Sequence, residues 1–147
     1  MKRILSVSFL LVFAVFYLCP VTSIGATKGL LLQFKGVALG DTKDVVHQKM
    51  GKPKSDSDGT EEYDLGESNS MEIQYGPKQT VETIVLYFYS NDDKVPKFED
   101  VIGDSSIDKR DNGSQIGKAV DSKSKASVTM VQTGGASPMT VITIKQL

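Results

Sequence analysis

The sequence predicts a small α+β domain, in which a short helix (or two) packs on one face of an antiparallel β-meander with a C-terminal β-hairpin. Three observations lead to this prediction. A helix pattern with both ends marked covers 42–50, strand patterns follow at short spacing over 61–89, and two more strand patterns flank Gly134 and Gly135. Loops of only a few residues between strands favour antiparallel pairing.

The helix pattern of 42–50 has a start and a stop signal. Asp41 is a suitable N-cap, because its carboxylate can accept hydrogen bonds from the first amides of a helix. Val46 and Met50 are four residues apart and would share one face. Gly51 suits the left-handed position after the last turn. A helix this short is not stable alone, so we expect it to pack on the strands that follow.

Three strands are predicted next, over 61–65, 71–75 and 81–89. The third is rich in β-branched and aromatic residues, the types enriched in strands. Because side chains alternate across a strand, its residues divide into two faces. One face holds Ile84, Leu86 and Phe88, and the other holds Val81, Val85, Tyr87 and Tyr89.

The remaining segments carry weaker patterns. Residues 30–39 could form a first strand or an irregular lead-in, because the run is short. A helical turn is expected over 96–103, burying Phe98, Val101 and Ile102. Residues 103–125 are rich in Ser, Asp, Gly and Lys and predict a loop-rich region with one short strand near 115–120. Segments 126–132 and 139–146 predict a hairpin that either extends the sheet or covers its second face.

The first 26 residues have the pattern of a secretory signal peptide. Lys2 and Arg3 precede an uncharged apolar run from Ile4 to Leu18, which is shorter than the roughly 20 residues of a membrane span. Small residues then favour cleavage near Ser23 or Ala26. We therefore expect a secreted or periplasmic protein with no membrane span after processing.

Residues 27–147 would then form a single domain, since about 120 residues suit one hydrophobic core. Cys19, the only cysteine, lies in the predicted signal. Lipid attachment there is the less favoured alternative, because the bulky Leu18 precedes it. Removal of Lys2 and Arg3 leaves 15 basic and 18 acidic residues, a net charge of −3. This balance argues against a nucleic-acid partner.

The helix and its flanks resemble a known family. The residues that carry the resemblance are Leu39-Gly40, Thr42, Asp44-Val45, Met50-Gly51 and Pro53, followed by a β-meander. Over residues 34–90 they resemble the SmpA/OmlA (BamE-like) domain and, equally, the small α+β domains of the β-lactamase-inhibitor-like kind. The resemblance implies helices on one face of an antiparallel sheet and a protein-binding role in the cell envelope.

No catalytic, cofactor or metal site is predicted. His47 is the only histidine, and zinc needs three or four ligands, so we interpret it as a surface residue. Without a second histidine or a mature cysteine, a nucleophilic constellation could use only His47. Neighbouring Glu61 and Glu62 would point to opposite sides of a strand, and we interpret both as solvated. Asp56 and Asp58 begin a calcium-like loop, but its final acidic ligand is absent.

The most notable candidates for function are Val85, Tyr87 and Tyr89. Tyrosines on an exposed sheet face bury much area in a protein contact at little entropic cost. Alternatively, the C-terminal hairpin covers this face and makes it core. The leading hypothesis is a non-enzymatic secreted or periplasmic protein-binding module. The alternatives are an inhibitor of a secreted or periplasmic hydrolase and a lipid-anchored envelope assembly factor.

Overall fold

The fold was taken from a computed structural model, which describes residues 29–89 and 95–147. Within them, eight strands form one antiparallel sheet in the order β3-β4-β5-β6-β10-β9-β8-β7, and two more form a small hairpin. The predicted α+β class is confirmed. In chain order the elements are β1 (Gln33–Phe34), β2 (Val37–Ala38), α1 (Lys43–Met50), β3 (Ser55–Ser57), β4 (Thr60–Gly66), β5 (Asn69–Tyr75), β6 (Val81–Phe88), α2 (Phe98–Ile102), β7 (Ile107–Lys109), β8 (Gln115–Asp121), β9 (Ala126–Gln132) and β10 (Thr140–Gln146).

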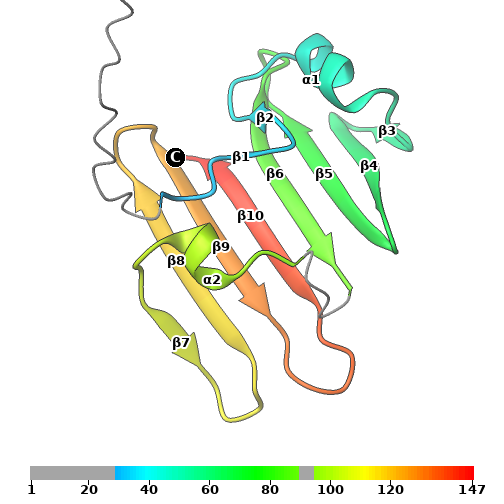
Figure 1. Cartoon of the computed structure of the whole chain (residues 1–147). Coiled ribbons are helices and arrows are strands. Elements are labelled where there is room, and N and C mark those ends of the chain that lie inside the picture. The colour runs from blue at the N-terminus through cyan, green and yellow to red at the C-terminus, as the bar shows by residue number, and fades with distance from the viewer. Residues whose placement is uncertain (1–28, 90–94) are drawn as a thin grey trace, which may run out of the picture.

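Both helices and the β1–β2 hairpin lie on the same face of the sheet (Figure 1). In this view the hairpin lies between α1 and α2. Its Phe34 meets Phe88 of β6 edge to face, with ring centroids 6.4 Å apart. The Leu31 amide donates to the Val101 carbonyl of α2 at 2.9 Å. A single hydrophobic core therefore lies between the sheet and this layer, and the opposite face of the sheet is open over the described residues.

Helix α1 begins one residue later than predicted. Its N-cap is Thr42, whose Oγ1 accepts a hydrogen bond from the Val45 amide, so the prediction of Asp41 as N-cap is wrong. Asp41 instead accepts hydrogen bonds from the Ala38 amide at 2.9 Å and from Lys49 Nζ at 2.7 Å. The Asp41 carboxylate therefore binds the lead-in loop and the last turn of α1 instead of the first amides of the helix. The helix ends as predicted, at Gly51 with a φ of 79°.

Strands β4, β5 and β6 form the predicted meander. Ile84 and its two alternating partners on β6 face the helices and are buried, as expected. Val81 does not lie on the face of Val85. Gln74 pairs with Thr83, whereas Tyr75 pairs with Val81, so Glu82 is an extra residue in β6. This bulge turns Val81 into the core, where it is fully buried, and corrects the predicted face of that residue.

The C-terminal hairpin extends the sheet instead of covering its second face. Strand β10 pairs with β6 and with β9, which places it at the centre of the sheet. The strand expected near 115–120 is β8, and the helical turn expected over 96–103 is α2, with its three apolar residues buried. Strand β7 was not predicted. It has three exposed residues and pairs only with β8, so it carries no apolar pattern of its own.

The predicted signal peptide and Cys19 lie outside the described residues. Among the helices of 29–89 and 95–147, none combines the length and the apolar character that crossing a membrane requires.

Candidate functional site

A buried carboxylate lies between α1 and the sheet. Glu61 of β4 has no exposed surface, which makes it the most deeply buried acid of the described residues. Its Oε2 accepts hydrogen bonds from the hydroxyls of Tyr63 at 2.7 Å and Tyr75 at 2.6 Å. Its Oε1 lies 2.7 Å from His47 Nε2 and 3.1 Å from Lys43 Nζ. We call these five residues the Glu61 cluster.

Local structure brings the Glu61 cluster together. Glu61 and Tyr63 are two residues apart on β4, so both side chains point to the helix side of the sheet. Tyr75 lies on the neighbouring strand β5. Lys43 and His47 are four residues apart on α1 and therefore share the helix face that meets β4. The first and second turns of α1 thus reach the same carboxylate.

Lys43 has further partners at the rim of the cluster. Its Nζ lies 2.8 Å from Asp56, which is directly opposite Glu61 in the pairing of β3 with β4. The same ammonium lies 5.6 Å from the centroid of the Tyr75 ring, within cation–π range. The hydrogen bond to Asp56, and to a smaller extent the one to Glu61, raises the pKa of Lys43. One lysine therefore joins two carboxylates and an aromatic ring.

The hydrogen bonds decide the charge state of Glu61. Burial by itself raises a carboxyl pKa, but donation from Tyr75, His47, Tyr63 and Lys43 outweighs burial and lowers the pKa of Glu61 from 4.5 to about 2. Burial, and to a smaller extent the hydrogen bond to Glu61, raises the pKa of both Tyr63 and Tyr75. Near neutral pH the cluster therefore holds a charged carboxylate and two neutral phenols.

The prediction that Glu61 is solvated is wrong, whereas the alternation of β4 contained the signal for its burial. Tyr63 and Leu65 alternate on one side of the strand, and a period of two puts Glu61 on that same side. An acid on a buried strand face needs donors, and tyrosines at 63 and 75 are suitable donors. His47, interpreted as a surface residue, has a side chain that is 40 % exposed, yet it also contacts the buried acid.

The Glu61 cluster is suited to holding α1 against the sheet. A carboxylate has about four lone-pair positions, and four donors occupy them here. The group therefore has little capacity left to accept a substrate proton or bind a ligand. Among residues 29–89 and 95–147, no three His, Cys, Asp or Glu side chains gather in an arrangement that could hold a metal ion.

The predicted contact residues lie on the other, open face of the sheet. Val85 and Tyr87 point to this face from β6, with Val85 8 % exposed and Tyr87 partly buried. Tyr89 follows the end of β6 and is 53 % exposed. The Tyr87 hydroxyl donates to Glu72 of β5 at 3.3 Å. Burial, and then the charge of Glu72, raises the pKa of Tyr87.

Strand pairing continues the apolar surface beyond these residues. Tyr87 pairs with Val141, Val141 with Val131, and Val131 with Ile116. These four side chains form one row across β6, β10, β9 and β8, which we call the apolar row. All four are only partly buried. The C-terminal hairpin therefore adds to the predicted contact surface.

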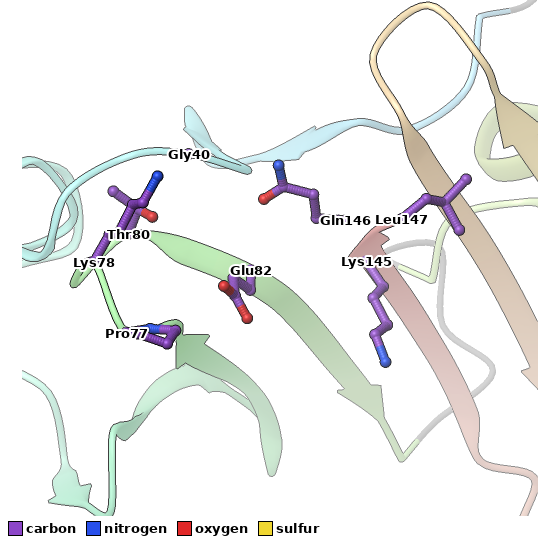
Figure 2. A pocket seen from close by; sticks show the side chains of 8 residues that line it. All are labelled: Gly40, Pro77, Lys78, Thr80, Glu82, Lys145, Gln146 and Leu147. Carbon is purple, nitrogen blue, oxygen red and sulfur yellow. The ribbon is translucent and has the colours of Figure 1, made fainter.

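A cleft of about 560 Å³ lies at one end of the sheet (Figure 2). Its charged side chains are Lys78 of the β5–β6 turn, Glu82 of the bulge and Lys145 of β10, and Leu147 lies at its border. The cleft forms where β6 extends past the end of β10 and pairs with residues 40–42 instead. It contains none of the predicted contact residues and none of the Glu61 cluster.

Comparison with family models, with curated proteins and with solved structures found no match to this chain.

Proposed function

We propose that this chain is a non-enzymatic protein-binding module of the periplasmic or extracellular space, which contacts its partner through the open face of the sheet. The observation that carries the proposal is the apolar row beside Val85. Partly buried Val, Ile and Tyr side chains are adjacent across four strands there, without a covering helix in the described part of the chain. Contiguous apolar surface on a soluble domain marks contact sites.

The composition of the face also supports protein binding. Tyr87 and Tyr89 provide aromatic area with a polar end, the kind of side chain enriched at binding hot spots. Glu72, Thr143 and Thr129 lie along one side of the row and provide polar groups that can hydrogen-bond to a partner. The main charged cluster on the opposite face is already saturated by its own donors, which favours a structural role for it over catalysis.

The contact face is tested by changing it without changing the core. In a Tyr87→Ser/Tyr89→Ser variant, we expect capture of a partner from an envelope or medium extract to fall about tenfold or more, since aromatic hot spots often exceed 1.4 kcal/mol. The matched control is Gln48→Ala/Lys52→Ala, two exposed residues near α1. Circular dichroism checks the fold of both. Normal capture by the tyrosine variant with loss in the control would place the contact on the helix side.

The nature of the captured protein separates the versions of this proposal. A hydrolase whose activity falls on binding would make the chain an inhibitor, and an assembly partner would make it an envelope scaffold resembling BamE-like domains. Measuring the intact mass of the exported protein tests the predicted signal peptide. We expect loss of the first 23 or 26 residues, whereas a lipid-modified Cys19 at the new N-terminus would replace this by an anchored form.

A further inference from the structure

The two halves of the open face carry opposite charge. Along β3 to β6, the positions that alternation assigns to the open face include three acids and no base, namely Glu62, Asp64 and Glu72, and Glu82 at the bulge is a further exposed acid. Along β7 to β10, they include two bases, Lys118 and Lys145, and one acid, Asp108 at the edge. These assignments follow from strand alternation and pairing, with the residues of the hydrophobic core facing the helices.

The charges lie at the ends of one row across the sheet. Strand pairing places six side chains side by side, in the order Glu62, Glu72, Val85, Thr143, Thr129 and Lys118. The acidic end lies on β4 and β5, the basic end lies on β8, and the centre falls between β6 and β10. The apolar row runs beside it.

This pattern is complementary to itself about one axis. A two-fold axis in the plane of the open face, parallel to the strands and between β6 and β10, exchanges β4 with β8 and β6 with β10. Glu62 of one copy then faces Lys118 of the other, and Tyr87 faces Val141. An axis perpendicular to the strands would place Glu62 on Glu62 instead. Because like charges at an interface cost several kcal/mol, the charges select the first arrangement.

We propose that this chain forms a homodimer in which two open sheet faces pack on each other about the axis parallel to the strands. The inference rests on the proposed function, since it uses the same face and names the partner as a second copy. Glu62 already lies 3.2 Å from Lys54 Nζ, an exposed pair of little strength that the contact with Lys118 can replace. The apolar row supplies the affinity, and the charges set the orientation.

The available area suits a dimer of this kind. Six central strands at about 4.8 Å spacing, each with about seven residues of about 3.3 Å rise, give a flat footprint of about 650 Å². Side chains make the sheet face uneven, so its accessible area is larger than this flat footprint. A standard interface buries about 800 Å² per partner. The face is therefore large enough without any further element.

Charge reversal tests the dimer. The full chain is expressed with its N-terminal segment, recovered after export, and followed by sedimentation over a concentration series. We expect the wild type to dimerise. Glu62→Lys and Lys118→Glu each place like charges together at two symmetry-related points and should weaken dimerisation about tenfold or more. Lys52→Glu, an exposed reversal away from the face, is the matched control and should change nothing.

Mixing the two single variants makes the test specific. A heterodimer of Glu62→Lys with Lys118→Glu restores both opposite-charge contacts, so the mixture should dimerise at concentrations at which each variant alone is mostly monomeric. The double variant should also recover. A wild type that stays monomeric at all concentrations, or dimerisation indifferent to both reversals, overturns the proposal. If Glu62→Lys fails to fold, Lys118→Glu and Tyr87→Asp still test the dimer, since both alter exposed or partly exposed side chains.

The outcome also separates this inference from the proposed function. A monomer whose capture of another protein depends on Tyr87 and Tyr89 rejects the dimer and keeps the binding face. A dimer broken by the reversals, with no other protein captured, makes the second copy the partner. A monomer with no capture through this face rejects both.

Discussion

In both halves of the molecule a short helix precedes four antiparallel strands, but the two helices are held by different forces. In the N-terminal half, α1 has a single buried residue, Val46, and is joined to β4 and β5 by the Glu61 cluster. In the C-terminal half, α2 is five residues long and buries three, Phe98, Val101 and Ile102. Equivalent places in one architecture are thus filled by charged hydrogen bonds on one side and by apolar packing on the other.

The strands beneath each helix match this difference. Below α2, strand β8 presents Gly117, and a Cβ there would collide with Ile102 Cδ1 and press on the Phe98 ring. The helix therefore approaches the sheet closely and excludes water. Below α1, strand β4 presents the larger Glu61 and Tyr63, which need polar partners when buried. A small strand residue permits an apolar contact, and a buried acid imposes a polar one.

The largest expected effect comes from removing the centre of the polar contact. Glu61→Ala leaves two tyrosine hydroxyls, His47 and part of Lys43 without their common acceptor. Breaking a buried ionic contact in this way costs about 3–5 kcal/mol, and Lys43 keeps Asp56 as a partner. We expect a loss of about 3 kcal/mol in the free energy of unfolding, measured by urea denaturation.

Glu62→Ala is the matched control for that measurement. The neighbouring acid points to the open face and lies 3.2 Å from Lys54 in an exposed pair. It should cost less than about 1 kcal/mol. Equal losses in the two variants would mean that the cluster contributes no more than an exposed ion pair, and the contrast between the two halves would disappear.

Acid should weaken the N-terminal half selectively, with an effect of similar but smaller size. The folded-state pKa of Glu61, about 2, lies below its ordinary value of 4.5. Its contribution is therefore complete above pH 4.5 and is lost as the pH falls through about 2. A difference of that size corresponds to about 3 kcal/mol at most. Urea denaturation between pH 2 and 6 should show this slope in the wild type and a flatter one in Glu61→Gln.

Hydrogen exchange in acid locates the effect. Amides of α1 should lose protection at a higher pH than those of α2, because no titrating side chain is among the buried residues of α2. Simultaneous loss in both helices would indicate that the halves unfold together, and the polar contact would then stabilise the whole sheet.

Local signals explain how much of this fold was predictable. The C-terminal end of α1 at Gly51, the apolar turn of α2 and the alternation in β4 and β5 each depend on neighbouring residues, and all were predicted. Much of what was missed depends on pairing between strands. Strand β7 exists only through β8, and the bulge at Glu82 is visible only in the register with β5. The four donors around Glu61 come from three elements, so no single stretch of the sequence predicts their arrangement.

The smallest expected effect tests the apolar contact in the C-terminal half. Gly117→Ala inserts a methyl group between β8 and α2, and overpacking of this kind costs about 1–3 kcal/mol. Alanine also restricts the unfolded chain more than glycine does, which offsets about 0.4–1 kcal/mol of this cost. We therefore expect a net loss of about 1–2 kcal/mol in urea denaturation. Gly113→Ala is not a suitable control, since its φ of 81° adds strain, whereas Gly29→Ala meets no atom within 4 Å.

A double-mutant cycle with Ile102 separates packing from backbone effects. Ile102→Val alone removes the Cδ1 atom of this buried side chain and should cost about 0.5–1.5 kcal/mol. If Ile102 Cδ1 is the atom that the new methyl group meets, Gly117→Ala should cost much less in that background, because the space is already vacated. Strict additivity would instead mean that Gly117 is required by the β8 backbone, and that α2 rests on the sheet without the close contact that distinguishes it from α1.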